Sequence, residues 1–64
     1  MIKFEDITKL TQEFSCTIAL EFGPDGVLSI KACGPRNSDF SIIRSDWDEK
    51  IIYDCIRDVC NRVR

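Results

Sequence analysis

Residues 15–33 read SCTIALEFGPDGVLSIKAC, and this stretch decides the fold. Apolar and polar side chains alternate on both sides of a central turn, which is the pattern of two half-buried β-strands. Within the turn, Pro24 suits the second position of a type I turn, and Gly26 accepts the left-handed backbone that closes a three-residue loop. The stretch therefore predicts a β-hairpin whose first strand runs from about Ser15 to Phe22.

The turn also predicts how the two strands pair. If Gly23 faces Val27, turn chemistry and alternation agree on one register, and one face of the hairpin is wholly apolar. Its pairs are Phe22 with Leu28, Leu20 with Ile30, and Ile18 with Ala32. The other face is expected to stay open to solvent, and it carries Thr17, Ala19, Glu21, Val27, Ser29, Lys31 and Cys33.

A third strand is predicted after a second turn region. Residues 34–39 are rich in residues that break regular structure, and residues 40–44 then read FSIIR. This strand is expected to pair with the second one and complete an antiparallel meander. We expect Phe40 and Ile42 to point inward, and Ile43 to be exposed or to lie under a neighbouring element.

Helices are predicted before and after the strands. Ile7, Leu10 and Phe14 fall on one helical face, which predicts a short helix over about residues 4–14. Ser45 or Asp46 is expected to cap a last helix that ends at about Arg62. Its predicted apolar stripe is Ile52, Cys55, Ile56, Val59 and Val63, with Ile51 and Cys60 at the borders of the stripe.

Together these elements predict a two-layer α+β fold in the order α-β-β-β-α, with residues 1–64 forming a single domain. Laying both helices on the apolar face of the three-stranded antiparallel sheet is the economical way to bury their stripes. A chain of 64 residues buries only about 60% of the surface that its unfolded form exposes. Domains of this size often depend on a staple or a partner for stability.

Composition and charge argue against several classes of function. The chain has 11 acidic and 9 basic residues, whereas a nucleic-acid binder usually has a basic excess. It has no histidine, the commonest general base, and no glycine-rich phosphate loop, so we expect neither an enzyme nor a bound cofactor. No apolar run approaches the roughly 20 residues that span a bilayer, and the first residues do not read as a signal peptide. We therefore expect a cytoplasmic protein with no membrane partner.

The cysteines are Cys16, Cys33, Cys55 and Cys60. Without a secretory signal, reduced thiols are the default, and zinc sites usually need short Cys-x-x-Cys pairs that this chain lacks. We interpret the cysteines chiefly as small buried hydrophobic residues, with a disulfide or a metal site as alternatives. The predicted register places Cys16 and Cys33 on opposite faces, so these two should not form a disulfide.

The candidate binding residues gather at the start of the last helix and continue along it. Trp47 either completes the core or is a partly exposed anchor, because tryptophan is enriched at binding hot spots. The predicted partner-binding residues are Asp46, Trp47, Asp48, Glu49, Asp54 and Asp58.

The predicted order of elements resembles two kinds of known protein. It is similar to the double-stranded RNA-binding domain, but residues 45–50 read SDWDEK where that family has a lysine-rich stretch, and these acids would repel phosphates. The same order in an acidic chain resembles small phage-encoded type II-A anti-CRISPR inhibitors. That resemblance implies an acidic surface that occupies the cationic nucleic-acid site of a host defence protein in the bacterial cytoplasm.

We therefore expect a phage or mobile-element accessory protein that binds a host protein, such as a CRISPR or other defence effector. One alternative is a self-assembling module that forms a homodimer through the open sheet face or an edge strand. The other is a divergent nucleic-acid-binding domain.

Overall fold

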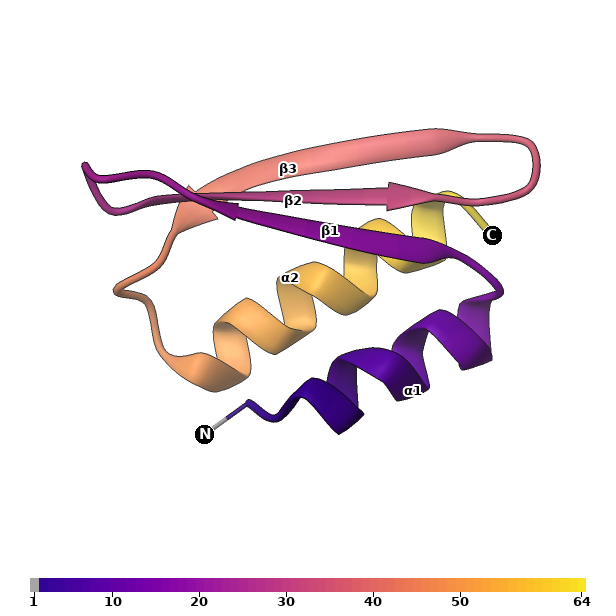
Figure 1. The fold of residues 1–64 in the computed structure, drawn as a ribbon, viewed down its shortest axis with the longest axis horizontal. Helices are drawn as coiled ribbons and strands as arrows, with labels where there is room; N and C mark the ends of the chain where they lie inside the picture. Colours follow the sequence, from indigo (N-terminus) through magenta and orange to yellow (C-terminus); the bar gives the residue numbers. More distant parts are fainter. Residues whose placement is uncertain (1) are drawn as a thin grey trace.

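The computed structural model describes residues 2–64 and has the predicted order of elements. These elements are α1 (Phe4–Phe14), β1 (Thr17–Phe22), β2 (Val27–Cys33), β3 (Ser38–Arg44) and α2 (Glu49–Arg62). The strands form one antiparallel sheet in the order β1-β2-β3, and both helices lie on the same side of it (Figure 1). The predicted α+β class and α-β-β-β-α order are confirmed.

The β1–β2 hairpin has the predicted turn and register. The Gly23 amide donates a hydrogen bond to the Val27 carbonyl oxygen at 2.8 Å. Gly26 has a φ of 83°, the left-handed conformation that glycine adopts without a Cβ penalty. The predicted pairs are all present, and the paired residues run from Thr17 opposite Cys33 to Phe22 opposite Leu28.

The predicted facing of β3 is wrong. Ile43 is only 6% exposed, whereas Phe40 and Ile42 are each 62% exposed. The reason is the β2–β3 register, which pairs Ile43 with Leu28 and so directs both side chains to the core face. The strand also begins at Ser38, two residues before the predicted start. Phe40 and Ile42 consequently join the open face of the sheet.

The predicted start of α2 is also wrong. The N-cap is Asp48, whose carboxylate accepts a hydrogen bond from the Lys50 amide at 2.8 Å. Ser45 does not cap the helix, because its hydroxyl and its amide both donate to the Gly26 carbonyl oxygen, at 3.2 and 2.9 Å, and so join it to the β1–β2 turn. Asp46 lies between these two points, in the connection that follows β3. The helix ends at Arg62, as predicted.

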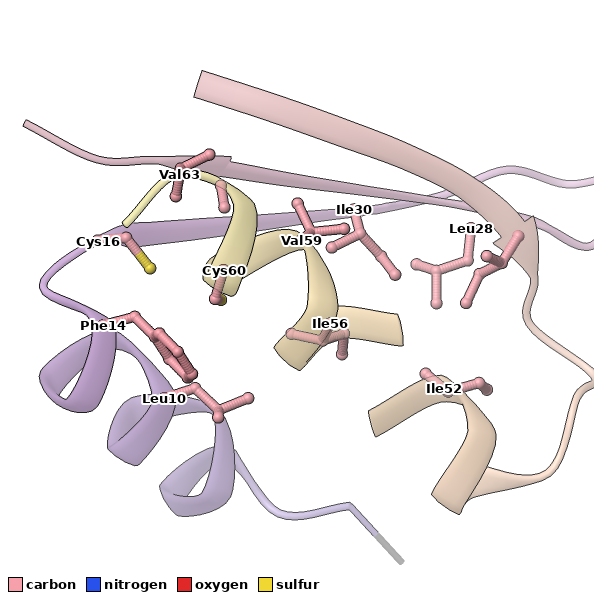
Figure 2. Close-up of a cluster of buried hydrophobic side chains, with 12 residues drawn as sticks. Leu10, Phe14, Cys16, Leu28, Ile30, Ile52, Ile56, Val59, Cys60 and Val63 are labelled. Atoms are coloured by element: carbon pink, nitrogen blue, oxygen red, sulfur yellow. The ribbon is translucent and has the colours of Figure 1, made fainter. Parts of the chain in front are cut away.

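One cluster of buried side chains joins the sheet to both helices (Figure 2). Cys60 lies within it at 0% exposure rather than at its border, and Cys55 is only half-buried, so the predicted stripe on α2 is shifted. The cluster consists of Leu10, Phe14, Cys16, Leu28, Ile30, Ala32, Ile43, Ile52, Ile56, Val59, Cys60 and Val63.

Candidate protein-binding site

The core face of the sheet is left uncovered at one end of β1. Phe22 and its partner Leu28 point to the same face, yet Phe22 is 67% exposed and Leu28 is 1% exposed. Leu20 and Ile30 differ in the same way, at 37% and 0%. The helices explain the difference, because α2 packs on β2 and β3 while α1 packs on β1 and α2. Figure 1 shows α1 diverging from β1 toward the N-terminus, which leaves the end of β1 without a cover.

This uncovered region is a groove with a volume of about 420 Å³. Phe4, at 93% exposure, stands at its margin, together with the polar residues Lys3, Ser45 and Glu49. We call it the apolar groove, and its floor and walls are formed chiefly by Ile2, Ile7, Leu20, Phe22, Ile52 and Ile56.

Carboxylates gather at the same end of the molecule. The β1–β2 turn, the β3–α2 connection and the start of α2 lie at this end of the molecule (Figure 1). The start of α1 lies beside the start of α2, since Asp6 and Glu49 line one surface hollow, and we call this half of the molecule the groove end. It holds seven of the 11 acidic side chains and three of the nine basic ones, a local charge of −4. The remaining four acidic and six basic side chains carry +2, which restores the chain total of −2. The acidic members are Glu5, Asp6, Glu21, Asp25, Asp46, Asp48 and Glu49, and the basic ones are Lys3, Arg44 and Lys50.

Four of the predicted binding residues, Asp46 to Glu49, lie at the groove end. Trp47 is 44% exposed and precedes the helix, so the interpretation that it completes the core is wrong. Asp46 approaches Arg44 at 3.8 Å, but both side chains are largely exposed, and exposed pairs of this kind contribute little to stability. Asp48 caps α2 by accepting a hydrogen bond from the Lys50 amide.

Asp54 and Asp58 lie elsewhere, further along the exposed side of α2. Asp58 pairs with Arg62 at 3.6 Å, and on the same surface Arg57 pairs with Glu13 at 3.3 Å. Arg57 also lies over the Phe14 ring at 5.6 Å from its centroid, and Arg64 does so at 5.8 Å. Glu13, Asp54 and Asp58 are thus matched here by Arg57, Arg62 and Arg64, and Arg62 also pairs with Asp39 at 3.4 Å. The predicted binding residues therefore divide into an acidic group at the groove end and a group in near-neutral surroundings.

Sequence reasoning missed the apolar part of the site. Alternation correctly placed Leu20 and Phe22 on the core face, but it assigned them to the core itself. Their exposure depends on where α1 diverges from β1, which no local pattern reports. The available signal was the surplus of apolar residues at Ile2 and Phe4, ahead of the stripe of α1.

The cysteines offer little reactive chemistry in the core. All four are free thiols, and Cys16 and Cys60 lie close together in the core cluster (Figure 2). Burial, and after it the hydrogen bond with Cys16, raises the pKa of the Cys60 thiol from 9.0 to about 12. The interpretation as buried hydrophobic residues holds for this pair, but Cys33 is exposed and Cys55 is half-buried. Within residues 2–64, no group of three or more side chains is placed to hold a metal ion.

Two further observations bear on function. Neither helix in the described part of the chain has the length and apolar character needed to cross a membrane. No family model, curated protein or solved structure matches the chain. Function is therefore inferred from the apolar groove and the charge around it.

Proposed function

We propose that this protein acts by binding another protein, with its groove end seated on a cationic surface of the partner. The partner class is a nucleic-acid-binding protein, such as a bacterial defence effector, whose cationic site the acidic end occupies. The chain would then be an accessory protein of a phage or mobile element that inhibits its partner by competing with nucleic acid.

The observation that carries this proposal is a local charge of −4 at the end of the molecule that also holds an exposed apolar groove. Carboxylates alone are ordinary on a protein surface, but large exposed apolar areas rimmed by polar residues typically mark interaction sites. Opposite charge accelerates association with a partner and selects against wrong ones. A duplex or single strand of nucleic acid carries the same sign as the groove end, so direct binding of nucleic acid there is disfavoured.

Matched charge reversals test the proposal. Asp46→Lys with Glu49→Lys changes the groove end, and Asp54→Lys with Asp58→Lys makes the same change in charge on the neutral side of α2. Each variant is immobilised, exposed to a nuclease-treated bacterial lysate, and its retained proteins are identified by mass spectrometry. We expect the wild type and the second variant to retain the same nucleic-acid-binding protein, and the first variant to lose it.

A competing DNA or RNA duplex should release the retained protein, because the duplex and the groove end bind the same cationic site. Asp48 is left unchanged, since its role as the α2 cap would mix a loss of stability with a loss of binding. Equal retention by both reversed variants, with circular dichroism showing that both are folded, would remove the groove end as the binding site.

Self-association through the open sheet face is a second candidate function, favoured by the exposure of Phe40 and Ile42. Both are 62% exposed on the side of the sheet that no helix covers. A charge at Ala19 or Ile42 should break such a dimer, as measured by light scattering. Ile43 is unsuitable for this purpose, because it is buried and a charge there would unfold the domain.

A further inference from the structure

We infer that the apolar groove receives the apolar side of a basic amphipathic helix supplied by the partner. This inference rests on the proposed function and deepens it, because it specifies what the cationic partner inserts. The groove and the carboxylates at the same end of the molecule then act as one recognition surface, with side-chain packing in the groove and charge beside it.

The groove is a gap in the cover of an otherwise closed core. Phe22 at 67% exposure is paired with Leu28 at 1%, so the cover of the core face stops between neighbouring strands. Its walls come from α1, β1 and α2 and are made of side chains, with Ile52 and Ile56 joining it to the buried cluster. A further layer placed on β1 would complete the two-layer packing that α2 already provides for β2 and β3.

The charge of the groove end decides which occupant is favoured. A second copy of this chain would bring one groove end with a charge of −4 against another, and like charges placed together oppose association. A cationic segment is favoured by the same charges. A helix suits a groove with walls of side chains, because residues spaced at i, i+3, i+4 and i+7 present one apolar row with basic residues on both sides of it.

The size of the groove agrees with this occupant. Its volume of about 420 Å³ is that of a small-molecule pocket, whereas a helix is about 10 Å wide with its side chains. The groove therefore admits the apolar side chains of one helix face, and the rest of the helix lies outside it. A helix of about 18 residues is about 27 Å long, and the molecule extends 32 Å along its longest axis. Such a helix is therefore able to fill the groove and still place its basic residues beside the carboxylates of α1 and α2.

Three synthetic peptides provide the test. The first is an amphipathic helix of about 18 residues made of leucine and lysine, the second has the same composition without an apolar face, and the third has glutamate in place of lysine. Binding is measured by fluorescence anisotropy, and the contacted residues are mapped by amide chemical shifts. We expect the first peptide to bind at least about tenfold more tightly than the other two, with shifts at Ile7, Phe22 and Ile52.

A matched pair of variants locates the contact. Phe22→Ser removes an aromatic ring from the groove, and Phe40→Ser removes an equally exposed one from the opposite face of the sheet, at 67% and 62% exposure. We expect about tenfold weaker binding for Phe22→Ser and no change for Phe40→Ser. Because both rings are exposed, both variants should fold, and circular dichroism verifies this.

The outcomes separate this inference from the proposed function. Equal binding of the first and second peptides would overturn the inference and leave an acidic site that recognises charge alone. Binding of none of the lysine peptides would overturn both proposals. A groove-mediated dimer, detected by sedimentation and lost in Phe22→Ser, would replace the helix with a second copy and also overturn the inference.

Discussion

Replacing the neighbouring isoleucines of β3 one at a time tests the corrected facing of that strand. Ile43→Ala should destabilise the protein strongly, whereas Ile42→Ala should have a small effect. The two residues are adjacent and identical in chemistry, so strand propensity and composition are matched. They differ in burial, since Ile43 is 6% exposed and Ile42 is 62% exposed.

The magnitudes follow from that burial. Ile→Ala removes three carbon groups, and burial of each contributes about 0.8 kcal/mol. For Ile43, which is 6% exposed, scaling by the buried fraction gives about 2.3 kcal/mol of lost transfer free energy. The cavity left beside Leu28 brings the cost to roughly 3 kcal/mol. For Ile42, which is mostly in water already, the same calculation gives less than about 1 kcal/mol.

Urea unfolding, followed by circular dichroism, measures both changes in the free energy of unfolding. A domain of this size has a total stability of roughly 3–10 kcal/mol, so Ile43→Ala is expected to approach the limit of folding. Ile43→Val is therefore the safer variant, with an expected loss of about 1 kcal/mol. If Ile42→Ala costs as much as Ile43→Ala, the β2–β3 register is not the one described.

Further predictions concern the cap, the turns and the thiols. Asp48→Ala should lower the free energy of unfolding by about 1 kcal/mol, through loss of the N-cap bond, while Asp46→Ala should change it little in the same urea assay. Gly34→Ala should be more destabilising than Gly23→Ala in thermal melts, because the added Cβ of the first meets the backbone carbonyl oxygen of Val63, whereas the close contact of the second is with the Asp25 side chain. A thiol reagent should modify Cys33 at once in the folded protein and reach Cys16 and Cys60 only after unfolding, so equal rates for all three would contradict the described core. Because the folded pKa of Cys60 is raised from 9.0 to about 12, its contribution to stability should be intact below pH 9 and decline as pH rises from 9 to about 12. Urea unfolding of the wild type and of Cys60→Ala across that pH range should show this additional decline in the free energy of unfolding in the wild type alone.

The sequence predicted the fold well where two local signals agreed. At the β1–β2 turn, Pro24 and Gly26 specify the loop and the alternation of β1 and β2 specifies the faces, so the register was correct throughout. In β3 the apolar pair Phe40 and Ile42 favoured the wrong face, and only the pairing with β2, which sets Ile43 opposite Leu28, directs Ile43 to the core. At α2 several residues are able to cap a helix, and the bond from Ser45 to Gly26 that excludes the earlier start joins residues far apart in sequence.

The candidate site was predicted in part for a similar reason. The acids from Asp46 to Glu49 are contiguous, so their proximity was visible in the sequence. The neutral surroundings of Asp54 and Asp58 come from arginines of α2 and the residues after it, including the Asp58–Arg62 pair. The contribution that the sequence did not show is Glu13 of α1, which pairs with Arg57 across the two helices. The apolar groove arises from the angle between α1 and β1, which tertiary packing sets.

The unequal placement of charge makes this small molecule an electric dipole, negative at the groove end. In the field of a cationic surface such a molecule experiences a torque that turns the groove end forward. The screening length is about 8 Å at physiological ionic strength, a quarter of the 32 Å length of the molecule. The torque therefore acts only in the last stage of approach, when one end feels the partner's field and the other does not. Its main effect is to select one docking orientation, which raises the fraction of encounters that lead to association.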